Sequence, residues 1–291
     1  MAERAANLTR TLRTMLVLGR VSNLPTVWSN CLAGWILGGT GPPASLAWVC
    51  AGATLLYVAG MYFNDAFDAT FDRQHRPERP IPSGAITVTA VWQWGFVWLC
   101  GGLACVWHLG TTPAILATLL SAAIIVYDVV HKIFAFSPIL MAACRFLLLL
   151  LAASIASNGV TGLAVWSALV LAAYVIGLSF IAQRESTHMA LRYWPVLFLL
   201  LPMGLALIVN TGEFQLPALI LILVLLIWMA RSLYFAFWSA QRNIGRAVSG
   251  LLAGIALVDA LAVVPGDPWA VTAFAALFLL ALVFQKFVPA T

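Results

Sequence analysis

The sequence contains ten apolar stretches, each close to the length of a helix that crosses a lipid bilayer. They lie at about residues 23–39, 46–64, 88–107, 113–130, 138–156, 162–182, 193–210, 216–237, 247–264 and 268–287. A membrane-spanning helix needs about 20 mainly apolar residues. The chain is 63% hydrophobic and 9% charged, whereas soluble domains carry about 25% charged residues. The pattern therefore predicts an all-α, polytopic transmembrane bundle of nine or ten spans, because only PGDP at 265–268 separates the last two.

The N-terminal segment is more basic than the spans that follow it. It carries Arg4, Arg10, Arg13 and Arg20, and no small-residue cleavage site follows these positions. A cleavable signal peptide is therefore not expected. The segment is either an amphipathic lead-in on the membrane surface or a polar terminus. We expect a cytoplasmic N-terminal lead-in over residues 1–22 and a single transmembrane domain over residues 23–287.

Basic residues alternate between the connections that join the predicted spans. Lys or Arg occurs near residues 73–79, at 132, at 184–192, at 242–246 and at 286, whereas the connections near 40–45, 108–112, 157–161, 211–215 and 265–267 carry neither. Basic loops stay on the cytoplasmic side of a membrane. The pattern predicts that both termini are cytoplasmic, in a multi-pass protein of a bacterial inner membrane. It also explains the net charge of +5 better than nucleic-acid binding does.

Cysteine and histidine give no sign of a transition-metal site. The five cysteines lie inside apolar runs without CxxC spacing, which favours buried free thiols over disulfides or a zinc site. The four histidines likewise show no ligand spacing.

Charge is concentrated in one stretch, NDAFDATFDRQHRPERPIPSG at residues 64–84. If the second span continues as a helix, Asn64, Asp68 and Asp72 lie one turn apart on one stripe. Carboxylate and amide oxygens suit Mg²⁺, which binds one or two carboxylates together with phosphate oxygens and water. Asp65 adds a further negative charge at the membrane boundary, where idle charge is costly. We therefore favour a magnesium site on Asn64, Asp68 and Asp72 over a solvated helix end.

The residues after this stripe are basic and stiffened by proline. The segment contains Arg73, Arg76 and Arg79 together with Pro77, Pro80 and Pro82. Cations next to a carboxylate–metal cluster are suited to binding a diphosphate.

The whole stretch resembles the first aspartate-rich motif of the UbiA superfamily of intramembrane prenyltransferases, NDxxDxxxD followed by an Arg-Pro-rich loop and PIxSG. The matching positions are Asn64, Asp65, Asp68, Asp72, Arg73, Arg79, Pro80 and Pro82 to Gly84. Weaker similarity begins at GRVSNLPTVWSN, where Arg20 and Asn23 match positions near the first helix of the family. The resemblance implies spans around a central cavity that opens to the lipid. It also implies Mg²⁺-dependent transfer of an isoprenyl chain from an allylic polyprenyl diphosphate to a lipophilic, possibly aromatic, acceptor.

The second aspartate motif of that family is missing. The corresponding stretch, YVIGLSFIAQRESTHM, holds Glu185 as its only acid, beside Arg184. This replacement most resembles the EboC-like branch of the superfamily. Arg184 is expected to replace part of the second metal ion electrostatically, because a guanidinium binds phosphate oxygens in a bidentate way. We expect one tightly held Mg²⁺ on the Asp68 and Asp72 side.

Four further charged residues lie within or beside the spans. Lys132 is at the position where the family places a diphosphate-binding lysine, and Asp128 could pair with it or face the cavity. Arg145 lies inside the fifth span, where an arginine normally faces a cavity or a partner. Asp259 is either a packed, hydrogen-bonded acid or the partner of another buried polar group, and no site role is assigned to it.

Together these residues form the predicted site. Asp68, Asp72 and Lys132 are the expected catalytic residues, and the expected substrate-binding residues are Arg20, Asn23, Asn64, Asp65, Arg73, Arg79, Lys132, Arg145, Arg184 and Glu185. An alternative function follows from the missing motif: the scaffold could bind a lipid diphosphate or another amphiphile for transport or assembly, without transfer chemistry. A secondary transporter is disfavoured, because the main polar cluster lies at the edge of the membrane rather than at its midplane.

Overall fold

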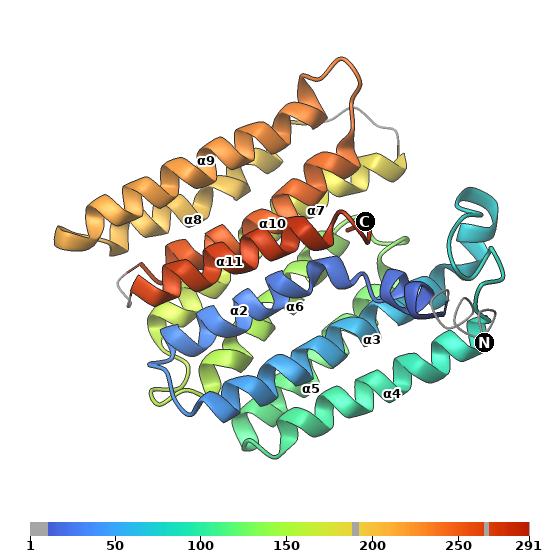
Figure 1. The fold of residues 1–291 in the computed structure, drawn as a ribbon, viewed down its shortest axis with the longest axis horizontal. Helices are drawn as coiled ribbons and strands as arrows, with labels where there is room; N and C mark the ends of the chain where they lie inside the picture. Colours follow the sequence, from blue (N-terminus) through green and yellow to red (C-terminus); the bar gives the residue numbers. More distant parts are fainter. Residues whose placement is uncertain (1–10, 188–191, 265–267, 291) are drawn as a thin grey trace, which may run out of the picture.

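The computed structural model describes residues 11–187, 192–264 and 268–290, and they form a bundle of helices with no strand in these ranges (Figure 1). A helical segment at residues 11–18 comes first. The elements after it are η1 (Val21–Asn23), α2 (Leu24–Leu37), α3 (Pro43–His75), α4 (Val88–Trp107), α5 (Thr111–Val130), α6 (Ser137–Ser154), α7 (Gly162–Thr187), α8 (Pro195–Val209), η2 (Gly212–Phe214), α9 (Gln215–Phe237), α10 (Ile244–Ala262) and α11 (Pro268–Phe284).

Each of the ten predicted spans corresponds to one helix, so the predicted all-α bundle is confirmed. Seven segments are long and apolar enough to cross a membrane: α3, α4, α5, α6, residues 162–183 of α7, residues 212–237 (η2 together with α9), and α10. The helix α8 and residues 269–284 of α11 are apolar but shorter. The helix α2 has 14 residues, because the helical segment at residues 11–18 ends in a turn at Gly19 and Arg20 and does not continue into α2. The chain is an integral membrane protein.

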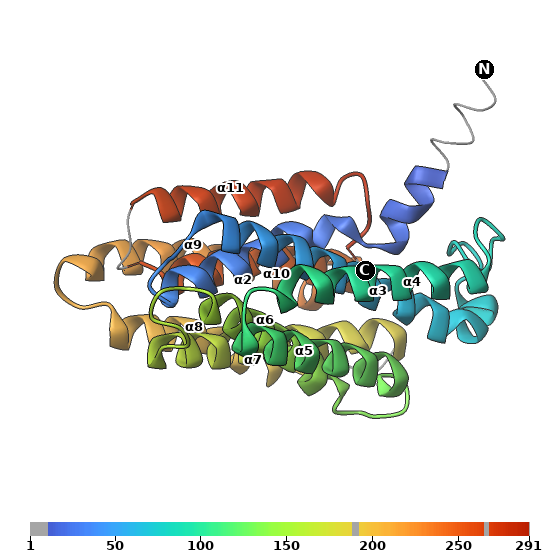
Figure 2. The ribbon, with the colours of Figure 1, turned by 90° about the horizontal axis from the view of Figure 1, so that it is seen from below.

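Consecutive helices run in opposite directions, so the connections gather at two ends of the bundle. The segments between α3 and α4 and between α9 and α10 lie at the right of Figure 1, and those between α2 and α3 and between α8 and α9 lie at the left. Figure 2 shows α11 over one face, α5 to α8 on the opposite face, and α2, α3 and α10 between them. Many large apolar side chains on α4, α5, α8 and α9 are exposed, as expected for helices that face lipid.

Small residues let α2 and α6 approach closely. A Cβ atom at Gly34 would overlap the carbonyl oxygen of Leu149, and one at Gly38 would lie 2.6 Å from the carbonyl oxygen of Ala153. Such glycines allow two helix backbones to come into contact within a membrane. As a result, polar side chains on α2 and α6 can meet inside the bundle.

The second predicted span ends at residue 64, but α3 continues to His75. The helix ends where Arg76 leaves the helical conformation and a proline-rich segment follows. The aspartate-rich residues therefore lie on the last turns of a long helix.

Candidate functional site

The stripe predicted on α3 is present in the structure. Asn64, Asp65, Asp68 and Asp72 are all at least 94% buried, although they lie near the end of the helix. Burying a carboxylate costs several kcal/mol unless cations and hydrogen bonds accompany it. The site is therefore best described by the partners of these side chains.

Two arginines from different segments reach this stripe. Arg79, in the segment after α3, places Nη1 at 2.9 Å from Asp72 Oδ2 and 3.3 Å from Asp65 Oδ1. Arg20 places Nη2 at 3.2 Å from both Asp65 Oδ1 and Asn64 Oδ1. Its backbone is left-handed, with φ of 40°. A non-glycine residue rarely adopts this conformation, and here it accompanies the break that turns the chain from residues 11–18 into η1.

The end of α5 supplies the third cation. Lys132 Nζ lies 2.7 Å from Asp68 Oδ1 and 3.7 Å from the centroid of the Phe71 ring. His131 Nε2 lies 3.3 Å from the same Asp68 oxygen. Burial disfavours the charged form of His131, but the hydrogen bonds to Asp68 and to the Asp128 backbone, together with the negative charges of both residues, outweigh this effect and raise the pKa of the imidazole.

A fourth carboxylate, Asp128 on α5, adjoins the stripe. Its Oδ1 accepts a hydrogen bond of 3.2 Å from Asn64 Nδ2, and its buried Oδ2 has no hydrogen-bond partner. The alternative that Asp128 pairs with Lys132 is wrong, because Lys132 pairs with Asp68. Asn64 donates to Asp128 and accepts from Arg20, so its amide joins a cation to an acid.

Three fixed cations, Arg20, Arg79 and Lys132, thus face Asp65, Asp68 and Asp72. Each of these carboxylates uses only one of its oxygens in the ion pairs. In the described part of the chain, no three His, Cys, Asp or Glu side chains are arranged to hold a metal ion by themselves. The remaining carboxylate oxygens nevertheless suit Mg²⁺, which commonly binds one or two carboxylates and takes its other ligands from phosphate and water. The donor set therefore fits a magnesium ion that binds together with a phosphate ligand.

The other predicted site residues are placed as follows. Asn23 donates to Tyr57 Oη at 3.2 Å and to the Ala290 carbonyl at 2.9 Å, and Tyr57 Oη donates to the Arg20 carbonyl at 3.4 Å. Asn23 therefore supports the segment that carries Arg20. Arg73 is exposed and is not brought to the carboxylates. Arg184 and Glu185 belong to α7, but their side chains lie outside the described residues.

Arg145 does not join the aspartate cluster, contrary to the sequence-based expectation. Its Nη1 donates to Asn30 Oδ1 at 2.7 Å and to the Thr26 carbonyl at 3.1 Å. Asn30 Nδ2 in turn donates to Asp259 Oδ2 at 2.7 Å, and Ser29 Oγ donates to the same oxygen at 2.5 Å. Asp259 is therefore a hydrogen-bonded buried acid that Asn30 links to Arg145. These contacts join α2, α6 and α10.

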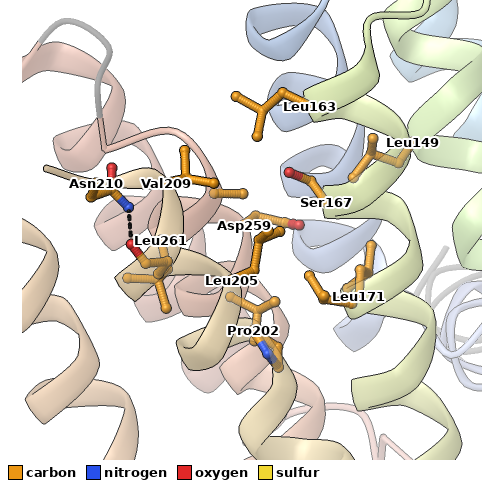
Figure 3. Close-up of a pocket in the computed structure, with 14 residues that line it drawn as sticks. Leu149, Leu163, Ser167, Leu171, Pro202, Leu205, Val209, Asn210, Asp259 and Leu261 are labelled. Carbon is orange, nitrogen blue, oxygen red and sulfur yellow. Dashed lines mark hydrogen bonds between the residues drawn. The ribbon is translucent and has the colours of Figure 1, made fainter.

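A pocket lies between α6, α7, α8 and α10 (Figure 3). The carboxylate of Asp259 and the hydroxyl of Ser167 point toward one another in it. Ser167 Oγ and Asn210 Oδ1 are buried without hydrogen-bond partners. The pocket is near the start of α7 and the ends of α8 and α10, at the opposite end of the bundle from the aspartate cluster. No Lys or Arg lines it, so it does not suit a diphosphate.

Sequence reasoning did not identify His131, Thr26 and Asn30 as partners of charged residues. His131 precedes Lys132, and both side chains reach Asp68 from the end of α5. Spacing along one helix cannot reveal such a contact between helices. The adjacency of His131 to a lysine predicted for the site was the one available signal.

The chain is similar to known proteins in sequence and in fold. The model of the UbiA prenyltransferase family matches residues 23–236. Digeranylgeranylglyceryl phosphate synthase of Methanoregula boonei is 38% identical over 86 residues, and the match covers 25% of this chain and 30% of that protein. The chain is thus aligned with less than a third of the length of this relative.

Two solved structures share the fold. One is a structure of digeranylgeranylglyceryl phosphate synthase in membranes, with a TM-score of 0.63 and 18% identity, which covers 90% of this chain and 99% of that chain. The other is an apo structure of a UbiA homologue from Aeropyrum pernix K1, with a TM-score of 0.50 and 15% identity, which covers 93% of this chain and 97% of that chain. At these identities the likeness concerns the fold alone.

Proposed function

Because the chain belongs to the UbiA prenyltransferase family, we propose that it transfers an isoprenyl chain from an allylic polyprenyl diphosphate to a lipophilic acceptor within the membrane. The observation that carries this proposal is the cluster in which Arg20, Arg79 and Lys132 converge on the carboxylates of α3. Three separate segments supply these cations, and the cluster lies where the spans end. A diphosphate whose tail remains in the membrane would meet it there.

Binding would exchange partners within this cluster. A diphosphate carries about three negative charges, and guanidinium and ammonium groups bind phosphate oxygens through charge-assisted hydrogen bonds. Arg20, Arg79 and Lys132 would turn part of their hydrogen bonding to the diphosphate. Asp68 and Asp72 would hold Mg²⁺, which supplies charge neutralisation of the leaving group when it is bound. In this proposal, ion pairs with the carboxylates hold the three cationic side chains in position before the diphosphate binds.

The reaction breaks the allylic C–O bond, and its electron pair leaves with the diphosphate. The allylic carbon then bonds to a nucleophilic atom of the acceptor, which loses a proton where that atom carried one. Fixed cations at the leaving group favour this step because they stabilise charge that develops in the transition state. The missing second aspartate motif supports one metal ion, with Arg184 of α7 proposed to compensate for the other.

The Mg²⁺ dependence and the donor can be tested in one assay. Purified protein is incubated with Mg²⁺, an acceptor panel and allylic diphosphates, beginning with geranylgeranyl diphosphate because the named relative is a digeranylgeranylglyceryl phosphate synthase. We expect diphosphate release that requires Mg²⁺ and is abolished in Asp68→Asn, whereas the matched variant Arg192→Gln releases diphosphate normally. Arg192 is exposed before α8 and belongs to another segment.

The missing second motif favours one alternative, a protein that binds a lipid diphosphate without transferring its chain. Diphosphate binding that depends on Asp68, with no release from any donor and acceptor pair, would establish that alternative. If Asp68→Asn binds the donor as tightly as the unmodified protein, both functions of this cluster are ruled out.

A further inference from the structure

Two arginines contact the same aromatic ring at the junction of α9 and α10. The guanidinium carbon of Arg246 lies 4.0 Å from the centroid of the Phe235 ring, and that of Arg231 lies 5.9 Å from it. Arg231 also lies 4.9 Å from the centroid of the Trp228 ring. Trp228 Nε1 donates to the Gly250 carbonyl at 2.7 Å, which fixes this ring between α9 and α10. The Phe235 ring thus lies within cation–π range of both guanidinium groups, one from each helix.

In the described part of the chain, no carboxylate pairs with either arginine. In residues 192–264 and 268–290 the acids are Glu213 and Asp259. Glu213 is in η2 at the opposite end of the bundle, and Asp259 is buried against Ser29 and Asn30. Arg231 and Arg246 form no salt bridge in the described structure. Two arginines on one aromatic ring without an acid leave their positive charge available to an anion from outside the chain.

The backbone of α10 adds to this positive potential. Arg246 is in the first turn of the helix, where its backbone N–H donates to Asn243 Oδ1 at 2.7 Å, and that turn has no acidic residue. The N-terminus of a helix carries a partial positive charge, which favours anions and disfavours cations. An arginine in this turn is thus unfavourable unless an anion binds beside it.

The surroundings of the pair identify the kind of anion. Large side chains near the end of α9 are more than half exposed, as on a surface that faces lipid. They are Ile227 and Tyr234 of the helix and Trp238 directly after it. Arg231 lies on the same helix and is itself exposed. Tyr and Trp are typical of the level of the lipid headgroups, and arginine side chains extend along apolar surface to that level. A phosphate at this position would belong to a lipid rather than to a soluble molecule.

We propose that Arg231 and Arg246, held by Phe235 and Trp228, bind the phosphate of an anionic phospholipid at the α9–α10 junction. Each planar guanidinium group can donate two parallel N–H groups to phosphate oxygens. The aromatic rings reduce the freedom of both side chains before the lipid binds. This site is separate from the aspartate cluster and does not depend on the proposed transfer reaction.

The experiment measures retained lipid by native mass spectrometry of the protein in mixed micelles that contain phosphatidylglycerol and phosphatidylcholine in equal amounts. The test variant is the double substitution Arg231→Gln with Arg246→Gln. The control is Arg192→Gln with Arg242→Gln, which makes the same change of charge in nearby exposed segments. We expect the test variant to lose about tenfold or more of its phosphatidylglycerol retention, since it loses charge-assisted contacts. We expect the control variant to lose less than about threefold, the effect of general attraction alone.

Three outcomes would overturn the proposal. They are equal losses in the two double variants, equal retention of phosphatidylcholine and phosphatidylglycerol by the unmodified protein, and displacement of the lipid by millimolar inorganic phosphate. The third would indicate a site for a soluble anion. If the double variant does not fold, Arg231→Gln and Arg246→Gln are compared singly with Arg192→Gln, with thermal unfolding measured for each.

Discussion

Asp68 is central to the proposed site, because two side chains from the end of α5 contact one of its oxygens. One of its oxygens accepts from Lys132 at 2.7 Å and contacts His131 at 3.3 Å. Asp65 likewise accepts from both Arg20 and Arg79. Removing one acid would therefore change the position of two cations, and removing one cation would leave a buried acid with fewer partners. Effects of single substitutions in this cluster should not be additive.

Lys132→Gln should weaken donor binding, because it removes one cation and leaves the glutamine amide within reach of Asp68. Loss of a charge-assisted hydrogen bond costs about 1.5–3 kcal/mol, and the affinity for a non-hydrolysable allylic diphosphate should fall about 10- to 100-fold. Equilibrium binding to the purified protein measures this change, with Arg192→Gln as the control of equal charge. Equal affinities of the two variants would remove Lys132 from the site.

Among the individual residues of the cluster, the acids of α3 and Arg79 were predicted from the sequence, whereas His131 was not. The acids of α3 could be recognised because they are one turn apart on one helix, and Arg79 because it follows them within the same motif. His131 could not, since its contact joins the ends of two helices. Arg145 was misplaced because an embedded arginine indicates a partner but does not identify it, and the partner here is Asn30.

At the level of elements, the close approach of α2 and α6 determines where Arg145 can reach. Gly34 allows α2 to touch α6 along the backbone, and this contact brings Thr26 and Asn30 within hydrogen-bond distance of Arg145. Helix periodicity predicted both spans but not their pairing. Such pairing depends on which small residues face each other, which one sequence does not show.

Gly34→Ala should destabilise the bundle, because the added Cβ overlaps the carbonyl oxygen of Leu149 and the Cβ of Ala152. Overpacking of a tight interface costs about 1–3 kcal/mol. The matched control is Gly204→Ala in α8, where an added Cβ meets nothing within 4 Å. Thermal unfolding in detergent should occur at a lower temperature in the first variant and at an unchanged or higher temperature in the second. If both variants unfold like the unmodified protein, α2 and α6 do not pack as closely as described.

Arg145→Met should lower stability without weakening the donor affinity of the protein that remains folded. The substitution leaves the oxygen of Asn30 without its donor and Asp259 without the nearby cation, and breaking a buried charge network costs about 3–5 kcal/mol. Thermal unfolding and diphosphate binding are measured on the same preparation, with Arg192→Met as the control. A tenfold loss of diphosphate affinity in folded Arg145→Met would show that Arg145 takes part in diphosphate binding.

At the scale of the whole molecule, ten apolar stretches were enough to predict ten helices, because membrane spans are marked by length and composition. The stripe of Asn64, Asp68 and Asp72 was predictable on the condition that the second span continued as a helix, and α3 does continue to His75. The break at Gly19 and Arg20 was not predictable, because the left-handed backbone of Arg20 leaves no pattern in the sequence. The pocket beside Asp259 likewise depends on the packing of four helices, which periodicity does not describe.

We propose an orientation of the bundle in the membrane from the distribution of its loop charges. Arg79, Lys132 and Arg242 lie in connections at the same end of the helices, and the described connections at the other end carry no Lys or Arg. Since basic connections are retained on the cytoplasmic side during insertion, the aspartate cluster should face the cytoplasm. It would then meet diphosphates made there. The arginine pair of α9 and α10 is at this same end, where cytoplasmic anionic lipids would reach it.

Fusions to reporter proteins test this orientation. Fluorescent protein joined after residue 80 or 240 should fluoresce, and alkaline phosphatase joined at the same positions should be inactive, because the phosphatase needs the oxidising exterior to form its disulfides. Fusions after residues 42 and 160 should give the opposite result. If the fusions at 80 and 240 reported different sides of the membrane, an odd number of the helices between them would not span it. The short helix α8 would then be the leading candidate for a helix that does not span. A reversed pattern at all four positions would place the aspartate cluster outside the cell. The proposed donor, a diphosphate made in the cytoplasm, could not then reach it without a carrier.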